Sequence, residues 1–165
     1  MPVVSHTFVP VFDSRSRLLI LGTMPSVKSR ESGFYYGHPR NRFWQVLAAL
    51  ANTQPPMTVA EKKAFLLSHG VAIWDVLHSC EIHASSDASI RREVPNDMRE
   101  ILSVVPIAHI YCNGAAACRL YEKHCLAQTG IPAVQLPSTS PANAAFSLDK
   151  LVMLWEAAIG KLPRV

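Results

Sequence analysis

The residue types best suited to chemistry are concentrated in one long polar segment, residues 22–44, which lies between an apolar run and an amphipathic pattern. Within it, three consecutive aromatic residues at 34–36 precede His38, Arg40 and Asn41. An irregular segment of this length is uncommon in a compact α/β domain unless it has a function, because the entropy lost on ordering it must be offset by contacts. We therefore expect the functional site to involve this segment.

The elements around this segment alternate between short apolar runs and helical patterns. Runs typical of buried strands occupy residues 18–21, 71–77, 107–111 and 133–136, and helical patterns occupy residues 41–50, 58–70, 96–105, 115–128 and 147–159. Thr58 and Glu61 form a capping box, and Asn96 is expected to cap the third helix. This alternation predicts a three-layer α/β sandwich with a central four-stranded, mainly parallel sheet and helices on both faces, in a single domain over residues 1–165.

In sheets of this kind, ligands bind outside the carboxyl ends of the strands. Those ends are Gly22 with its long segment, Asp75 with the residues to 79, Asn113 with Gly114, and the loop at 137–143. We expect these four segments, which are far apart in the sequence, to meet along one edge of the sheet.

The composition indicates a folded protein. The chain has 165 residues, of which 49% are hydrophobic and 17% are charged, so it can form a substantial core. Its longest apolar runs are far shorter than the ~20 residues of a membrane span, and residues 1–5 have no signal-peptide pattern. We expect a soluble, monomeric, cytoplasmic protein. Its formal charge of +4 at pH 7 is compatible with an anionic partner.

The cysteine and histidine residues show no spacing typical of metal ligands. Cys118 and Cys125 are seven residues apart on a predicted helix and would share a face, but a metal or cluster site needs closer, convergent ligands. We interpret all four cysteines as reduced thiols in the core. The sequence therefore predicts neither a metal nor a cofactor.

Three stretches carry a further signal: residues 19–26, residues 35–44, and residues 136–143 with their continuation to 151. Together, and in matching order over nearly the whole chain, they resemble the uracil-DNA glycosylase superfamily and, within it, the hypoxanthine-DNA (deoxyinosine) glycosylases. The pattern His-Pro-x-Asn-x-Phe-Trp, which begins at His38 after an aromatic pair, is specific, whereas Gly-x-x-Pro at Gly22 alone would be weak. The resemblance implies the fold of that superfamily and hydrolysis of an N-glycosidic bond.

One position departs from the mismatch-specific relatives in this superfamily. Their first motif has an Asn that positions the attacking water, whereas this chain has Met24, which can neither hold water usefully nor act as a base. The hypoxanthine-type family also lacks that Asn, and the resemblance moves the catalytic role to Asn41, whose amide could accept a hydrogen bond from water. The neighbouring Arg40 and Arg42 would favour an anionic backbone nearby. Alternatively, Asn41 is simply the N-cap of the next helix, and both roles can hold.

The resemblance also implies a base-binding pocket made by Gly22, Thr23, Met24, Tyr36 and Asp75. Tyr36 matches the family position whose ring stacks on the extruded base, although such aromatic residues would be unremarkable in a core. Asp75 ends an apolar strand and could accept a hydrogen bond from N1–H of hypoxanthine. It could equally be the structural partner of an arginine or of a helix N-terminus.

The remaining predicted contacts are with the DNA strand. They are Ser26, His38, Arg40, Asn113, Ser138, Ser140, Pro141, Ala142 and Asn143. Asn113 should mainly cap the helix at 115, although a helix N-terminus there would also suit a phosphate. Serines beside prolines are typical of a rigid loop that clamps phosphates and presses Pro141 or Ala142 into the space left by the base. Ala142 is small, so its intercalation would be weak, and an ordinary turn is the alternative.

The predicted function is a monofunctional DNA glycosylase that acts on duplex DNA containing deaminated bases, hypoxanthine first, and leaves an abasic site. No lysine in these motifs is placed to form a Schiff base, and Lys28 is the nearest candidate. The alternatives are a glycosylase for uracil or other lesions and a non-catalytic DNA-binding protein of the same fold, which Met24 favours. Other nucleotide-binding proteins and hydrolases are disfavoured, because the chain has no G-x-G-x-x-G, Walker or Gly-x-Ser-x-Gly sequence.

Overall fold

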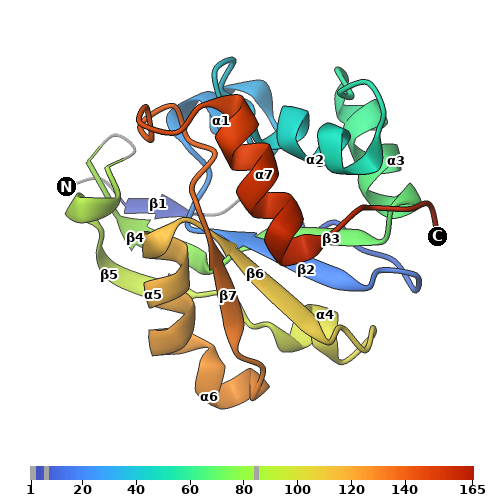
Figure 1. The fold of residues 1–165 in the computed structure, drawn as a ribbon. Helices are drawn as coiled ribbons and strands as arrows, with labels where there is room; N and C mark the ends of the chain where they lie inside the picture. The colour runs from blue at the N-terminus through green and yellow to red at the C-terminus, as the bar shows by residue number, and fades with distance from the viewer. Residues whose placement is uncertain (1–2, 6–7, 84–85) are drawn as a thin grey trace.

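A four-stranded parallel sheet forms the centre of the computed structural model, which describes residues 3–5, 8–83 and 86–165. Its strands are β2 (Leu18–Gly22), β3 (Val71–Asp75), β6 (His109–Asn113) and β7 (Ala133–Leu136), in the order β3-β2-β6-β7 (Figure 1). All of β3 and all but the first residue of β2 are buried, as expected for strands that are covered on both faces. The predicted central sheet is confirmed.

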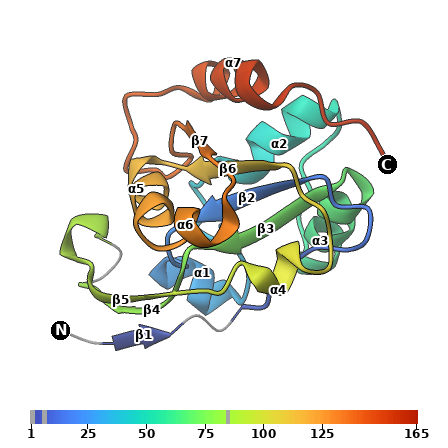
Figure 2. The ribbon, with the colours of Figure 1, turned by 90° about the horizontal axis from the view of Figure 1, so that it is seen from below.

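Helices cover both faces of this sheet, which confirms the three-layer arrangement. Helices α2 (Phe43–Ala51), α3 (Val59–Ser68) and α7 (Leu148–Ile159) lie on one side, and α4 (Arg99–Leu102), α5 (Ala115–His124) and α6 (Leu126–Thr129) lie on the other (Figures 1 and 2). Helices α2 and α7 pack on each other through the fully buried rings of Phe43 and Trp155, whose centroids are 6.0 Å apart. The predicted capping box is present at the start of α3, where Thr58 Oγ1 accepts from the backbone N–H of Glu61 at 3.0 Å.

A second sheet is present that the sequence patterns do not predict. β1 (Val3–Ser5), β4 (Leu77–Glu81) and β5 (Arg91–Pro95) form an antiparallel sheet in the order β1-β4-β5. This sheet lies toward the carboxyl ends of the parallel strands (Figures 1 and 2). β4 and β5 belong to one hairpin, residues 77–95, whose connection contains the short 3-10 helix η1 (Asp87–Ser89).

The strand predicted at 71–77 is wrong at its end, because the chain leaves the parallel sheet at Val76. Asn96 holds this bend: its Nδ2 donates to the carbonyl oxygens of Asp75 at 2.9 Å and Leu77 at 3.1 Å. Asn96 therefore does not cap α4, which begins at Arg99 and has the Asp97 side chain as acceptor for its first N–H. An amide that resembles a helix cap in the sequence joins the two sheets instead.

Other boundaries also differ from the prediction, and the strand expected at 107–111, for example, is β6 at His109–Asn113. Residues 22–44 are not entirely irregular, because α1 (Val27–Ser32) begins after Ser26 and ends at Gly33, whose φ of 82° is left-handed. The helix expected from 41 begins at Phe43, and the helix expected at 115–128 is broken at Cys125 into α5 and α6. Cys118 and Cys125 therefore do not share one continuous helix face.

The remaining expectations concern cysteines, metals and membranes. All four cysteines are free and buried, which confirms their interpretation as core thiols. Within the described ranges, no three His, Cys, Asp or Glu side chains come together in a way that could hold a metal ion. None of the helices in the described part of the chain has the length and apolar character needed to cross a membrane.

Candidate active site

The carboxyl ends of the parallel strands meet around one cavity, as predicted. The strand register aligns them, because Gly22 lies opposite Asp75 on one side, and Leu21 lies opposite Cys112 on the other. The cavity has a volume of about 140 Å³. This is small beside the roughly 300–1,000 Å³ of pockets for drug-sized ligands, so it suits one planar ring system rather than a whole nucleotide.

Most of the predicted site residues line this cavity. They are Gly22, Thr23, Met24, Ser26, Tyr36, Asn41, Asp75, Asn113, Ser138 and Ser140. Ala142 and Asn143 line an adjoining hollow that shares Ser138 and Ser140 with the cavity. His38, Arg40 and Pro141 are not among the residues that line the cavity, so the structure brings together the predicted base-binding residues but not all of the predicted DNA contacts.

Gly22 lines the cavity at a point where two polar side-chain groups approach its backbone closely. A Cβ atom on residue 22 would be 2.4 Å from Asp75 Oδ1 and 3.0 Å from the Tyr36 hydroxyl. A side chain at this position would therefore collide with the carboxylate. The missing side chain of Gly22 allows the Asp75 carboxylate and the Tyr36 phenol to converge on one point.

Asp75 is buried, with only 3% of its surface exposed, at the end of β3. Its place on the cavity wall fits the recognition of a base edge. Its alternative role as a purely structural carboxylate stays a second prediction, which substitution can distinguish.

Of the two residues in the 34–36 run that line the cavity, Tyr35 and Tyr36, the less buried is Tyr36. Its backbone has a φ of 52°, which is uncommon for a residue other than glycine, and its ring stacks on Phe43 with centroids 3.8 Å apart. Burial and the nearby Asp75 carboxylate raise the pKa of the Tyr36 phenol, so it stays protonated at physiological pH. Because Phe43 covers one ring face, only the other face could stack on a base.

The other two aromatic residues of this run are core residues, which is the ordinary interpretation of such side chains. Tyr35 is 2% exposed, and its hydroxyl donates to the Val9 carbonyl at 2.8 Å. Phe34 stacks on Trp44 with ring centroids 6.1 Å apart. Together they anchor the segment that presents Tyr36.

Asn41 is at the centre of a hydrogen-bond chain that links three segments of the site. Its Oδ1 accepts from the backbone N–H of Phe43 at 3.0 Å and from the Thr139 hydroxyl at 2.8 Å. Thr139 is fully buried, and it exchanges two hydrogen bonds with the Asn113 side chain, each 3.0 Å long. Asn41 therefore accepts from the first N–H of α2, whose N-cap position is Arg42, and it also lines the cavity, while its catalytic role stays a prediction.

The hydrogen bonds that Asn41 makes leave only its amide nitrogen for a water molecule. The amide oxygen has two lone pairs, and Phe43 and Thr139 occupy both. The group left for a water is Nδ2, which donates rather than accepts. The prediction that Asn41 accepts a hydrogen bond from water is therefore replaced by one in which it donates to the water oxygen.

Thr139 is the central residue that the sequence did not reveal. It lies between Ser138 and Ser140 in a loop of small polar residues, and no local pattern distinguishes it from them. The only signal was its place in a loop already assigned to the site.

Arg42 stabilises this loop rather than remaining available to DNA. Its guanidinium donates to the carbonyl oxygens of Ser140 and Asn143, each at 3.0 Å, and to that of Phe146. The loop is further closed by Asn143 Nδ2, which donates to the Ser138 carbonyl at 3.0 Å. These hydrogen bonds hold the loop together, its role as a phosphate clamp stays a prediction, and the expectation that Arg42 favours a nearby phosphate backbone is not supported.

Several predicted DNA contacts have local structural roles. Ser26 Oγ caps α1 by accepting from the backbone N–H of Ser29, and His38 Nδ1 accepts from the backbone N–H of Arg40 at 3.0 Å. Asn113 does not cap α5, whose cap is Gly114, because its amide is paired with Thr139. The main role predicted for Asn113 is therefore wrong, although its place at the cavity is correct.

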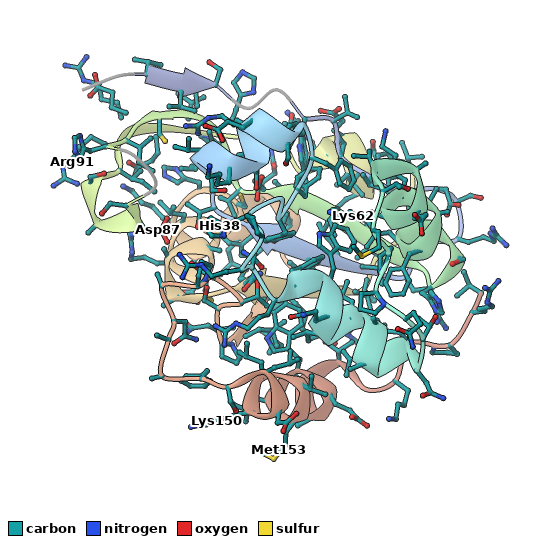
Figure 3. All side chains as sticks on the ribbon, turned by 90° about the horizontal axis from the view of Figure 1, so that it is seen from above. His38, Lys62, Asp87, Arg91, Lys150 and Met153 are labelled. Atoms are coloured by element: carbon teal, nitrogen blue, oxygen red, sulfur yellow. The ribbon has the colours of Figure 1, made fainter. Side chains whose placement is uncertain are left out.

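The hairpin supplies a wall of the cavity that the sequence did not predict. Ile82 and Asp87 both line the cavity, and Asp87 also lines the adjoining hollow. Withdrawal of its carboxylate from water raises the pKa of Asp87, and Arg119 partly opposes this effect. Figure 3 shows Asp87 and His38 toward one end of the molecule, with Arg91 beyond them on the hairpin.

The fold and the cavity together define a class of α/β protein whose site lies at the carboxyl edge of a parallel sheet and accepts one planar group. The model of the uracil DNA glycosylase superfamily matches residues 9–158, and this chain belongs to that superfamily.

Two relatives are named hypoxanthine DNA glycosylase. The protein from Methanosarcina acetivorans is 31% identical over 156 residues, which cover 94% of this chain and 98% of the relative. The protein from Methanosarcina barkeri is 28% identical over 100 residues, which cover 60% and 63% respectively. The solution NMR structure of a candidate uracil DNA glycosylase from M. acetivorans superposes with a TM-score of 0.81 at 31% identity, covering 96% of this chain and 98% of that one.

Proposed function

We propose that this protein is a monofunctional DNA glycosylase that hydrolyses the N-glycosidic bond of deaminated bases in DNA, hypoxanthine first, and leaves an abasic site. The observation that carries the proposal is the cavity itself, with the Asn41 amide among its lining groups and the Asp75 carboxylate over Gly22. The membership of the superfamily and the name of the two Methanosarcina relatives support the same conclusion.

The size of the cavity requires the base to leave the duplex. A cavity of about 140 Å³ cannot accept a stacked base pair, so the target nucleotide must be extruded from the helix. Cleavage then develops positive charge on the sugar and negative charge on the departing base. Asn41 Nδ2 would position a water for attack at the sugar carbon, and the Asp75 carboxylate would accept from N1–H of the base.

Water is the proposed nucleophile because the cavity offers no amine. No lysine is among the described residues that line it. Lys28, the nearest candidate in the sequence, is exposed on α1 and is 3.3 Å from Glu31. The product is therefore an intact strand with an abasic site rather than a nicked strand.

The proposed partner is duplex DNA that contains deaminated bases, and the proposed form is a monomer in the cytoplasm. The formal charge of +4 and the pI near 9.0 support an anionic partner.

The test uses end-labelled duplexes that contain inosine, uracil or xanthosine, each incubated with the protein and then treated with alkali. Alkali-dependent cleavage should occur at inosine, and the released base should be hypoxanthine. Met24 lines the cavity at the position where mismatch-specific relatives have a water-binding Asn, and this favours a non-catalytic DNA-binding protein as the second candidate. A preparation that binds the inosine duplex and releases no base would establish that second candidate.

A further inference from the structure

The Tyr36 hydroxyl is buried and has no hydrogen-bond partner among the residues that the structure describes. Most buried polar groups in proteins are hydrogen-bonded, because an unpaired one loses its interaction with water and gains nothing. The Asn113 amide lies nearby and hydrogen-bonds Thr139 through both Nδ2 and Oδ1, but the Tyr36 hydroxyl makes no hydrogen bond of good geometry with it. An unsatisfied phenol in the cavity therefore calls for an explanation.

The surroundings of Tyr36 prevent it from moving to find a partner. Its ring is held against Phe43 with an interplanar angle of 15°, and its backbone adopts a φ of 52°. Strained or unsatisfied groups that the surrounding structure holds in place are concentrated at functional sites. The position of this hydroxyl is thus fixed in advance of any ligand.

The Tyr36 hydroxyl and the Asp75 carboxylate form a pair with opposite hydrogen-bonding character. Both lie within 3.0 Å of the point that a Cβ on Gly22 would occupy, so one flat edge entering the cavity can meet both. The phenol is a donor, and an ionised carboxylate can only accept. The pair therefore complements an edge that presents an acceptor next to a donor.

Deamination creates such an edge. Adenine presents a ring nitrogen acceptor beside an amino donor, whereas hypoxanthine presents N1–H as a donor beside the O6 acceptor. The same exchange occurs when cytosine becomes uracil, which presents N3–H beside a carbonyl oxygen. Guanine and thymine have a similar edge, but their stable pairing makes extrusion costly, and this cost is itself a source of selectivity.

We propose that the Tyr36 hydroxyl is a specificity-determining donor that, with Asp75, recognises the lactam edge of deaminated bases. This inference rests on the proposed glycosylase function and gives Tyr36 a role at the edge of the base in place of stacking on its face. Tyr36 donates to the carbonyl oxygen on which negative charge develops as the base departs, so its contribution is larger in the transition state than in the bound substrate.

The test is Tyr36→Phe, which removes one oxygen atom and keeps the ring on Phe43. The single-turnover rate of hypoxanthine release should fall roughly 10- to 100-fold, and the rate for uracil should fall by a similar factor. The melting temperature should stay the same or rise by up to about 4 °C, because the variant no longer buries an unpaired hydroxyl.

The matched control is Tyr111→Phe, which removes a buried hydroxyl that donates to the Ala158 carbonyl at 3.4 Å and does not line the cavity. This control should retain the wild-type rate on both bases. Tyr36→Phe with the wild-type rate, or with a lost rate and a lower melting temperature, would overturn the inference and leave the proposed function intact. If the wild-type protein releases no base, both the inference and the proposed function are wrong.

Discussion

The two sheets supply different walls of the same cavity and differ in how firmly they hold their residues. The parallel strands β2 and β3 are almost entirely buried and end in Gly22 and Asp75. No residue of β5 is fully buried, and the hairpin contributes Ile82 and Asp87 from its connection rather than from a buried strand. Groups on buried strands keep more precise positions than groups on loops. We therefore expect the parallel sheet and its loops to govern the chemical step, and the hairpin to influence DNA binding.

The largest expected effect is that of Asn41→Ala. The single-turnover rate of base release should fall roughly 100- to 1,000-fold, as occurs when one well-placed donor is removed from a comparable site. Affinity for an inosine duplex should change far less. The measurement is a rapid-quench time course with enzyme in excess over labelled duplex.

Asn41→Asp separates catalysis from capping. Aspartate can still accept from the Phe43 N–H and the Thr139 hydroxyl, but it lacks the Nδ2 donors proposed to hold the water. The rate should therefore fall while the melting temperature changes little. A normal rate per folded molecule in Asn41→Asp would show that Asn41 acts only as a cap.

The second-largest effect is expected from Asp75→Asn at the end of β3, and the same substitution at Asp87 on the hairpin is its matched comparison. Asp75→Asn keeps the size of the side chain but removes its charge, and it should slow hypoxanthine release roughly 10- to 100-fold. Because both bases present an N–H beside a carbonyl oxygen, the rate for uracil should fall by a similar factor. Rates for both bases should be measured on one preparation whose melting temperature is recorded.

Asp87→Asn is the matched variant on the hairpin. It removes a carboxylate that lines both the cavity and the adjoining hollow, so duplex affinity should rise slightly while the ratio of the two base-release rates stays at the wild-type value. A lower melting temperature in Asp75→Asn, with a normal rate of base release per folded molecule, would assign Asp75 to the scaffold. A changed ratio in Asp87→Asn would mean that the hairpin also recognises the base.

The same contrast explains which parts of the fold could be predicted from the sequence. β2 is an unbroken apolar run that ends in Gly22, and a run of this kind has few other uses than a buried strand. β5 contains Arg91, Arg92 and Glu93, and it is stabilised by pairing with β4 rather than by its own pattern. A strand that depends on its partner in this way leaves little signal in its own residues.

The same limit applies within the site. The place of Asn41 and Asp75 followed from strand ends and from a specific motif, which are local features. The hydrogen bond between Asn41 and Thr139 joins residues 98 positions apart, and no local pattern marks it. Asn96 shows the converse, because a residue type favoured at helix starts is used to join two sheets.

A smaller effect is expected from Arg92→Gln on the hairpin. The Arg92 side chain is 83% exposed, and its Nε is 3.6 Å from Glu81 Oε2. The backbone of Arg92 has a φ of 51°. If Arg92 contacts one phosphate, the slope of log affinity against log salt concentration should become less steep by about 0.9. The base-release rate at saturating enzyme should not change. Lys161→Gln, which removes an exposed cation near the C-terminus, is the control, and an equal slope in both variants would exclude the hairpin contact.

The smallest effect concerns the attachment of the hairpin to α5. Glu93 Oε1 is 2.6 Å from Lys123 Nζ and 3.3 Å from His124 Nε2, and the Lys123 hydrogen bond is the main reason that the pKa of Glu93 falls from 4.5 to about 2. A carboxylate whose pKa is lower in the folded state stabilises that state above its unfolded pKa. This contribution is fully present above about pH 4.5 and is lost as the pH falls toward about 2.

Because Lys123 is 59% exposed, Glu93→Gln should reduce the free energy of unfolding by no more than about 1 kcal/mol at pH 7. Urea titrations of both proteins at pH 7, 5 and 3 should show this difference shrinking only at the lowest pH, and a difference that is constant with pH would mean that the ion pair is not its cause.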